Sequence, residues 1–347
     1  MLQVGNVQLP SNAFLAPVAG YFDLAYRLVV RSVPGYKGHA AVGLTCTDLL
    51  CPQALLSENE KSLWLAATSP DDKPVCMQLY GANAEIMAEA AQWSEAHGAT
   101  MIDINMGCPV DKVTKRNGGS KLLCDPCNTI KMAEAIVKSV NIPVTAKIRL
   151  GWDDSSLIHT TLPTQLADVG IAMITVHGRT TEQRFKPSVR IPLIAETVAA
   201  LKSNHSIPVI GNGDIKIPQD AKRMIDETGC DGIMVARGAM GQPWLFRDIV
   251  YHLETGKLPR PYPRIERMKC VIRHFENMLT MRDERIATNT IRVRMSRYSP
   301  HLQPWPNLKR DIQYVKTASE MRDFLNAGLE RISQEDGITD PSFELAT

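Results

Sequence analysis

Eight short apolar runs, most of them with β-branched residues, recur along the first two thirds of the chain, with helical patterns between them. As strand candidates these runs are Phe14–Pro17, Ala41–Thr45, Val75–Leu79, Met101–Ile104, Val144–Ile148, Met173–Val176, Val209–Ile210 and Gly232–Val235. The alternation of strands and helices predicts a parallel α/β architecture. Eight strands spread over about 240 residues favour a closed (β/α)8 TIM barrel over an open doubly wound sheet. The first run leads into Ala16-Pro17-Val18-Ala19-Gly20, not into a dinucleotide-type glycine motif, which also argues against the open sheet.

Residues that suggest chemistry or ligand contacts stand at the C-terminal end of seven of these strands. They are Pro17, Gln78, Asn105, Cys108, Lys147, Arg149, His177, Asn212, Asp214 and Arg237. In a (β/α)8 barrel these strand ends meet at one mouth, where the active site is built. A random scatter of polar residues would not keep this phase through so many strands, so the pattern predicts an enzyme.

The pattern changes at Tyr262-Pro263, after which helices follow one another without strands. The helix candidates before and after this break are Ala84–His97, Cys127–Val140, Leu162–Val169, Leu193–Ser203, Ile217–Thr228, Met268–Arg282, Ile286–Tyr298 and Ile312–Asn326. We expect a catalytic barrel over residues 1–260 and a helical domain over residues 261–347. The second part has more Lys and Arg than Asp and Glu, although the net charge of the chain is only +2. On charge alone, a solvated helical surface explains this excess as well as nucleic-acid contacts do.

The composition argues against several classes of protein. Met1–Pro10 lacks the basic and apolar regions of a signal peptide, and no apolar stretch reaches the ~18 residues of a membrane span. Eight scattered cysteines suit reduced thiols in the cytoplasm better than a disulfide framework. Cys124 and Cys127 form a lone CxxC, which we interpret as a helix start capped by Asp125-Pro126, so no metal is expected. Nothing signals an oligomer, and a monomer is expected.

Two glycine-containing segments follow the last two strands: Gly211-Asn212-Gly213-Asp214 and Ala236-Arg237-Gly238-Ala239. Small residues let backbone N–H groups approach an anion closely, and these two loops are the usual phosphate site of such barrels. Arg237 can add charge-assisted hydrogen bonds to a phosphate. Either segment alone would be an ordinary turn, but together they predict a phosphate-bearing cofactor.

Four more strand-end residues suit contacts with a cofactor or substrate. A cation at Lys147 can stabilise negative charge on a reduced flavin ring or a substrate carbonyl, the alternative being a lysine at the barrel rim. Arg149 has the same strand phase as Lys147. At His177 a ligand contact is favoured over a structural role. The Gln78 amide offers a donor and an acceptor to the edge of a flavin or uracil ring.

Cys108 lies in a Gly-Cys-Pro turn directly after a strand. A buried structural cysteine is the usual fate of a thiol in a core, but a strand-end turn is not a core position. No histidine adjoins it in the sequence to favour a thiolate nucleophile, so a general-acid role is preferred.

Longer motifs surround these residues. They are Ala16-Pro17-Val18-Ala19-Gly20 with Asp23 and Arg27, Asp103-Ile104-Asn105-Met106-Gly107-Cys108-Pro109, Lys112-Val113, Gly119-Ser120, Leu122-Leu123, Lys147-Ile148-Arg149-Leu150-Gly151-Trp152, His177-Gly178-Arg179-Thr180, Asn212-Gly213-Asp214 and Arg237-Gly238. On these motifs the chain resembles the tRNA-dihydrouridine synthases, which reduce the C5–C6 bond of uridine in tRNA. It is most similar to their bacterial B subgroup, over about residues 1–325.

The resemblance implies a barrel followed by a helical domain, with tRNA held between them. It implies that reduced FMN gives a hydride to C6 of uracil, that Cys108 protonates C5, and that NADPH supplies the electrons. Asn105 and Arg149 would hold the uracil edge. The implied FMN contacts are Pro17, Val18, Ala19, Gln78, Lys147, His177, Asn212, Gly213, Asp214, Ala236 and Arg237.

Two alternatives remain open from the sequence. One is an FMN barrel that acts on a free pyrimidine, as dihydroorotate dehydrogenases do, which leaves the basic C-terminal helices without a role. The other is a tRNA-binding chaperone whose flavin is structural, which leaves the strand-end residues without a role.

Overall fold

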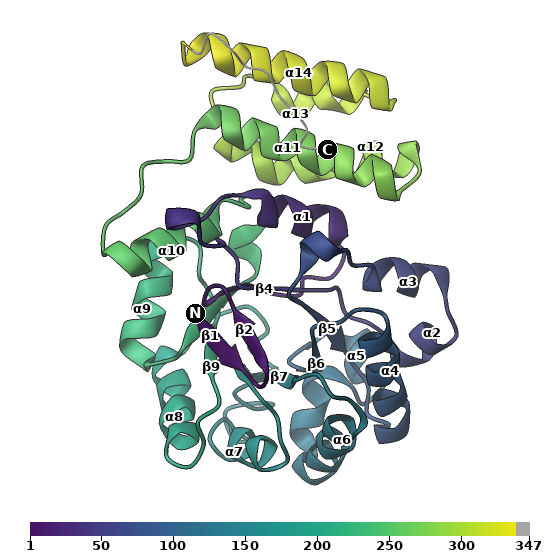
Figure 1. Ribbon diagram of the computed structural model, residues 1–347, viewed down its shortest axis with the longest axis vertical. Coiled ribbons are helices and arrows are strands. Elements are labelled where there is room, and N and C mark those ends of the chain that lie inside the picture. The colour runs from purple at the N-terminus through teal and green to yellow at the C-terminus, as the bar shows by residue number, and fades with distance from the viewer. Residues whose placement is uncertain (338–347) are drawn as a thin grey trace.

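The computed structural model describes residues 1–337, and its centre is a closed barrel of eight parallel strands (Figure 1). The strands are β3 (Ala13–Leu15), β4 (Leu44–Cys46), β5 (Val75–Leu79), β6 (Met101–Met106), β7 (Val144–Arg149), β8 (Ile174–His177), β9 (Val209–Asn212) and β10 (Gly232–Val235). They follow one another around the barrel in chain order, and β10 closes it against β3. The predicted (β/α)8 barrel is confirmed, and all eight strand candidates overlap a strand.

Helices and short helical segments connect the strands on the outside of the barrel. They are α1 (Leu24–Ser32), α2 (Pro52–Leu56), α3 (Glu60–Ala66), α4 (Ala84–Ala96), α5 (Asp111–Thr114), α6 (Pro126–Ser139), α7 (Thr161–Asp168), α8 (Ile191–Lys202), α9 (Pro218–Thr228) and α10 (Leu245–Thr255). The five helices predicted in this region are confirmed as α4, α6, α7, α8 and α9. The start of α6 is as expected, since the Asp125 side chain accepts the Asn128 N–H and Pro126 occupies the first turn.

An N-terminal hairpin that the sequence analysis missed closes one end of the barrel. It consists of β1 (Leu2–Val4) and β2 (Val7–Leu9), which pair antiparallel. Val4 and Leu9 are fully buried among interior side chains of the barrel such as Phe14 and Met173. A Cβ added at Gly5 would meet Pro143 and Ala172, which lie one and two residues before the starts of β7 and β8. The hairpin therefore seals the N-terminal ends of the strands, and only the opposite end is left for a site.

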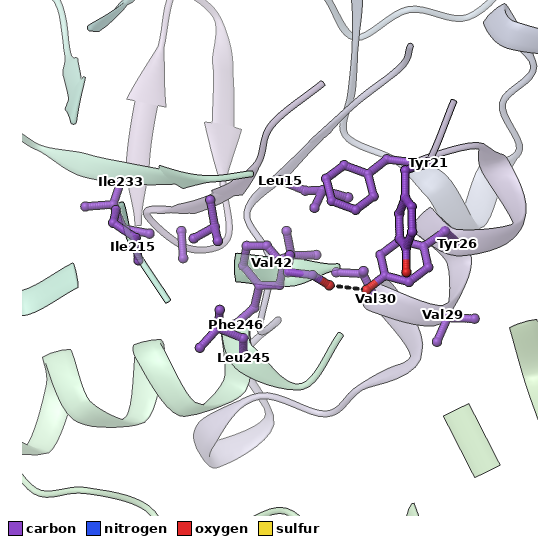
Figure 2. Close-up of a cluster of buried hydrophobic side chains, with 14 of the residues drawn as sticks. Leu15, Tyr21, Tyr26, Val29, Val30, Val42, Ile215, Ile233, Leu245 and Phe246 are labelled. Atoms are coloured by element: carbon purple, nitrogen blue, oxygen red, sulfur yellow. Dashed lines mark hydrogen bonds between the residues drawn. The ribbon is translucent and has the colours of Figure 1, made fainter. Parts of the chain in front are cut away.

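A second core lies between the barrel wall and its helices. Figure 2 shows part of it, with Leu15 and Ile233 of adjacent strands in the same cluster as Val30 of α1 and Phe246 of α10. Complete burial of each such side chain contributes about 1.5–3 kcal/mol. The Tyr26 hydroxyl crosses this layer and donates to the Ala239 carbonyl in the turn after β10. The outer core thus holds a strand-end turn in place.

Up to residue 337, four α-helices follow the barrel and form a bundle on one side of it, above α1 in Figure 1. They are α11 (Arg264–Met281), α12 (Glu284–Tyr298), α13 (Leu308–Asp311) and α14 (Ala318–Glu335). The prediction of one helix over Ile312–Asn326 is wrong. A 3-10 turn occupies Ile312–Tyr314, and α14 begins only after Thr317, whose hydroxyl accepts the Glu320 N–H while the Glu320 carboxylate accepts the Thr317 N–H. This capping box starts a new helix inside the predicted one.

A buried ion pair joins the bundle to the barrel. Arg294 of α12 donates to the Asp23 carboxylate at 2.5 Å and to the Gly20 carbonyl at 3.3 Å, and both charged side chains are almost fully buried. Arg294 also donates to His274 of α11. The expected boundary at residue 260 falls in the connection between α10 and α11 and stays a prediction. Residues 338–347 of the expected second domain lie outside the described residues.

Candidate active site

A cavity of about 330 Å³ opens at the C-terminal ends of the barrel strands. Thirteen of the fourteen predicted site residues line it, although they come from segments far apart in the sequence. They are Pro17, Val18, Ala19, Asn105, Cys108, Lys147, Arg149, His177, Asn212, Gly213, Asp214, Ala236 and Arg237. Gln78 does not line the cavity, because it is completely buried behind Asn105.

Strand register explains why these side chains meet. Asn105 of β6 pairs with Lys147 of β7, and His177 of β8 pairs with both Arg149 and Asn212. Alternate residues of a strand point to the same face, so these positions all face the barrel axis. Lys147 Nζ donates to Asn212 Oδ1 at 2.9 Å, which ties β7 to β9 at the floor of the cavity.

The turn that carries Cys108 is held from two sides. Asn105 Oδ1 accepts the backbone N–H groups of Gly107, at 3.2 Å, and of Cys108, at 2.9 Å. The Cys108 carbonyl accepts the backbone N–H and the hydroxyl of Ser120, both at 3.0 Å. Gly119, at φ +61°, passes so close that a Cβ there would lie 2.7 Å from the Cys108 carbonyl oxygen. Only glycine fits both this conformation and this contact.

The surroundings of Cys108 favour the thiol over the thiolate. Burial raises the pKa of Cys108, and the Val110 backbone N–H, Arg149 and Lys147 offset only part of this rise. The group is therefore protonated at neutral pH. A protonated thiol can give up a proton to a substrate, whereas a nucleophilic cysteine needs a lowered pKa.

Lys147 and His177 lie on the same side of the cavity and differ in charge. Burial, with Arg149 nearby, lowers the pKa of Lys147 to about 8, so this ammonium is charged at neutral pH. Burial and the surrounding cations hold the pKa of His177 well below its usual value, so the imidazole is neutral. Arg179 Nη1 lies 3.1 Å from His177 Nε2. Because a guanidinium only donates, Nε2 must accept, which leaves the imidazole proton on Nδ1.

Arg149 holds two loops together at the edge of the cavity. Its Nε donates to the Gly107 carbonyl at 2.7 Å, and its Nη1 donates to the carbonyls of Thr180 and Arg184 at 2.8 Å. These three bonds fix the guanidinium beside the Cys108 turn. They use Nε and Nη1, so Nη2 is the part of the group that remains for a ligand.

Asp214 organises the arginines of the phosphate-type loops. It adopts φ +52°, and its carboxylate accepts from Arg179 at 2.5 Å, from the Val189 N–H at 3.0 Å and from Arg237 at 3.3 Å. Partial burial alone would raise the pKa of Asp214, but the bonds from Arg179 and Val189 and the charge of Arg237 bring it below its usual value. The ionised carboxylate thus holds the Arg237 side chain at the cavity through an ion pair.

The sequence matches the family model described as dihydrouridine synthase over residues 14–335. The chain belongs to the dihydrouridine synthase family. A "Probable tRNA-dihydrouridine synthase" of Rickettsia typhi is 36% identical over 304 residues, which cover 87% of this chain and 89% of the relative. The "tRNA-dihydrouridine synthase B" of Shewanella oneidensis is 32% identical over 334 residues, 96% of this chain and all of the relative. The B-type protein of Pseudomonas aeruginosa is 35% identical over 268 residues, 77% of either chain.

Ten residues that line the cavity of this family member were not among the predicted site residues, and two of these ten, Phe185 and Lys216, carry an aromatic ring or a charge. Phe185 is half exposed, and the guanidinium groups of Arg149 and Arg237 lie 5.7 and 5.2 Å from the centroid of its ring. Lys216 also lines the cavity, from the loop between β9 and α9. Both belong to loops without periodicity. The only signal for Phe185 was an aromatic residue in an otherwise basic loop, Arg184-Phe185-Lys186.

The lining of this family member suits an anionic cofactor. Lys147, Arg149, Lys216 and Arg237 all reach it, against the single carboxylate of Asp214, which is already paired. Two loops with small residues, Asn212–Asp214 and Ala236–Gly238, line it after the neighbouring strands β9 and β10. This donor set fits a phosphate and an electron-rich ring such as those of FMN. Within residues 1–337 no cluster of His, Cys, Asp and Glu could hold a metal ion.

Proposed function

We propose that this chain reduces the C5–C6 bond of uridines in tRNA to 5,6-dihydrouridine, with FMN as cofactor and NADPH as electron donor. The observation that carries the proposal is a half-buried, protonated Cys108 thiol in a cation-rich cavity of a dihydrouridine synthase barrel. The relatives named as tRNA-dihydrouridine synthases support tRNA as the substrate.

The cavity residues divide into those that would hold the cofactor and those that would meet the base. Residues Pro17, Val18, Ala19, Lys147, His177, Asn212, Gly213, Asp214, Ala236 and Arg237 would hold FMN, with Gln78 behind them. When bound and reduced, FMN supplies a hydride to C6 of uracil. Lys147 contributes a positive charge, which stabilises negative charge on a reduced ring.

Cys108 completes the reduction by transferring its thiol proton to C5 of the same base. Hydride and proton together add two hydrogens across the double bond, and the sulfur is left as a thiolate. Arg149 and Lys147 both favour the charged form of Cys108, so they stabilise this thiolate until solvent returns a proton.

Asn105 and Arg149 would select uracil by its carbonyl oxygens. The two acceptor positions of the Asn105 oxygen are taken by Gly107 and Cys108, so its amide can offer only an N–H to a ligand. Arg149 likewise only donates. Uracil presents acceptors at O2 and O4, whereas cytosine places a donor amine at position 4, opposite a donor. This arrangement favours uridine over cytidine.

The bundle α11–α14 would bind the body of the tRNA. Its excess of Lys and Arg suits phosphate contacts, which fix position and orientation and not base identity. The target base must leave its stack to reach a barrel mouth. We also propose a monomer in the cytoplasm, a location that the eight free cysteines and an RNA substrate support. Within residues 1–337 no helix is long and apolar enough to cross a membrane.

Nucleoside mass spectrometry of tRNA tests the activity. Deletion of the gene should remove, from one or more positions, the uridine that is heavier by two hydrogens. The wild-type gene should restore it and a Cys108→Ala gene should not. Unchanged dihydrouridine at every position, in cells without another such synthase, contradicts the proposal. Purified enzyme that reduces a free pyrimidine but no tRNA would favour the dihydroorotate-dehydrogenase-like alternative.

The rate of uridine reduction should fall as the pH rises through about 8, because Lys147, whose pKa is lowered to about 8, loses its proton and its positive charge there. In Lys147→Arg this decline should move to higher pH, since a guanidinium stays charged. Ionisation of Cys108, whose pKa is raised, then sets the upper limit in that variant. Single-turnover rates across pH measure both profiles. Identical profiles for the two proteins would show that Lys147 does not control the rate.

A further inference from the structure

Directly behind the Cys108 turn, side chains of three neighbouring strands form a continuous line of hydrogen bonds. Asp103 of β6 pairs in register with Gln78 of β5 and Thr145 of β7, and all three are buried. Asp103 Oδ2 accepts from Gln78 Nε2 and Oδ1 accepts from Thr145 Oγ1, each at 2.6 Å. Gln78 Oε1 accepts from Asn105 Nδ2, also at 2.6 Å.

Asn105 connects this line to the thiol. With its Nδ2 directed at Gln78, its Oδ1 faces the backbone N–H groups of Gly107 and Cys108. An ionised carboxylate only accepts hydrogen bonds, so Gln78 must turn its NH2 group to Asp103 and its oxygen to Asn105. If Gln78 were reversed, its oxygen would face the carboxylate, and the Asn105 NH2 would face two N–H donors. Asp103 therefore sets the direction of both amides.

We propose that Asp103 is a positioning residue for the proton donor, acting through Gln78 and Asn105 to fix the backbone that carries Cys108. The inference rests on the proposed function and deepens it. It explains why a carboxylate lies inside the barrel, two residues before the base contact Asn105, without reaching the cavity. It also gives Gln78 a role that its position behind the lining allows.

The charge state of Asp103 supports this role. Burial raises the pKa of Asp103 to about 6, and the hydrogen bonds from Thr145 and Gln78 and the charge of Lys147 limit the rise. The carboxyl is thus ionised at neutral pH and acts as an acceptor only. The other titratable group against it is Cys76, whose pKa is raised well above its usual value and which stays a neutral thiol.

Two substitutions at position 103 distinguish the role of the hydrogen-bond acceptor, which sets the direction of the amides, from that of a side chain that merely fills the space. Asp103→Leu removes the acceptor at similar size, which leaves the Gln78 NH2 without a partner and both amides free to turn. Asp103→Asn keeps an oxygen towards Gln78, because its NH2 can face the Thr145 hydroxyl while that hydroxyl donates to the Ile102 carbonyl, 3.3 Å away. The asparagine variant is therefore the matched control.

The experiment reduces each holoenzyme with NADPH and follows its single-turnover oxidation by tRNA. Asp103→Leu should be slower by about 100-fold, as expected for a reacting group displaced by about 1 Å. Asp103→Asn should stay near the wild-type rate. FMN content and the rate of reduction by NADPH should be unchanged in both. A leucine variant that is oxidised at the wild-type rate overturns the proposal.

Alkylation of Cys108 by iodoacetamide, resolved by peptide mass spectrometry, gives a readout that needs no turnover. The rate should rise in Asp103→Leu, as the turn loosens, and stay at the wild-type value in Asp103→Asn. Equal rates in all three proteins contradict the inference. If tRNA does not oxidise the reduced wild-type enzyme at all, the proposed function fails. Alkylation still tests whether the line of hydrogen bonds positions Cys108.

A third variant tests the proposal independently, in case the Asp103→Leu protein does not fold. In Gln78→Glu a protonated carboxyl keeps the direction of the line, whereas an ionised one places like charges beside Asp103. Alkylation of Cys108, compared with wild type at each pH, should then become faster as the pH rises. Lys147 lies close enough to Asp103 to shift the midpoint of this change but not its sign. If the ratio of the Cys108 alkylation rates in Gln78→Glu and wild type does not vary with pH, the proposal is overturned.

Discussion

Cys108→Ala is expected to slow the oxidation of the reduced enzyme by tRNA about 100-fold or more, the contribution of a positioned general acid. The thiol is the proton donor to C5 in the proposed reaction, and burial keeps it protonated at neutral pH. Binding of FMN and its reduction by NADPH should stay close to wild type, because the proposed cofactor contacts come from other strand ends. Stopped-flow spectroscopy at the flavin absorbance measures both half-reactions separately.

The matched control for this variant is Cys230→Ala. Cys230 is a buried thiol, and burial raises its pKa as it does that of the half-buried Cys108, but it lies at the N-terminal side of β10 and donates to the Gly232 carbonyl, away from the cavity. Its removal should leave both half-reactions unchanged. Cys108→Ser should fall between wild type and alanine, since a hydroxyl is a weaker acid than a thiol. Oxidation of Cys108→Ala at the wild-type rate would exclude Cys108 as the donor.

The barrel could be predicted from the sequence because its strands are short, apolar and regularly spaced. Fully buried parallel strands have mainly apolar residues on both faces, and short, mainly apolar runs such as Val75–Leu79 and Val144–Ile148 show this in the sequence. The N-terminal hairpin was missed because Leu2–Val4 and Val7–Leu9 have only three residues each, too few for a visible period. Its sealing role comes from contacts with residues over a hundred positions away, such as Pro143.

The residues of the candidate site could be named from the sequence, but their hydrogen-bond partners could not. The position of Asn105, Lys147 and His177 along their strands is enough to place them at one mouth of the barrel, since side chains alternate between the two faces of a strand. Whether Gln78 faces the cavity or lies behind Asn105 depends on register between β5 and β6, which local sequence does not encode. The helix predicted over Ile312–Asn326 was wrong for a local reason. The helical spacing of apolar residues continues across Thr317, so it does not reveal that a capping box starts a new helix there.

Replacing Arg294 with leucine is expected to lower the free energy of unfolding by about 3–5 kcal/mol, the cost of leaving the partner of a buried ion pair uncompensated. Arg294 and Asp23 are 5% and 4% exposed, so water cannot replace the lost bond. The matched control is Arg297→Leu, one turn further along α12 and exposed, which should change stability by less than about 0.5 kcal/mol. Urea unfolding followed by tryptophan fluorescence measures both.

A double-mutant cycle shows whether Arg294 acts through Asp23. Asp23→Asn removes the charge but keeps an oxygen for the Tyr26 N–H that caps α1. If the pair is the source of the effect, adding Asp23→Asn to Arg294→Leu should cost much less than it costs alone, because no buried charge is left unpaired. Additive costs would assign the loss to the bonds of Arg294 with His274 and Gly20 instead. In either case Arg294 anchors α12 to Gly20, which directly follows the cavity residues Pro17–Ala19, so the fit of the bundle and the shape of the cavity depend on the same side chain.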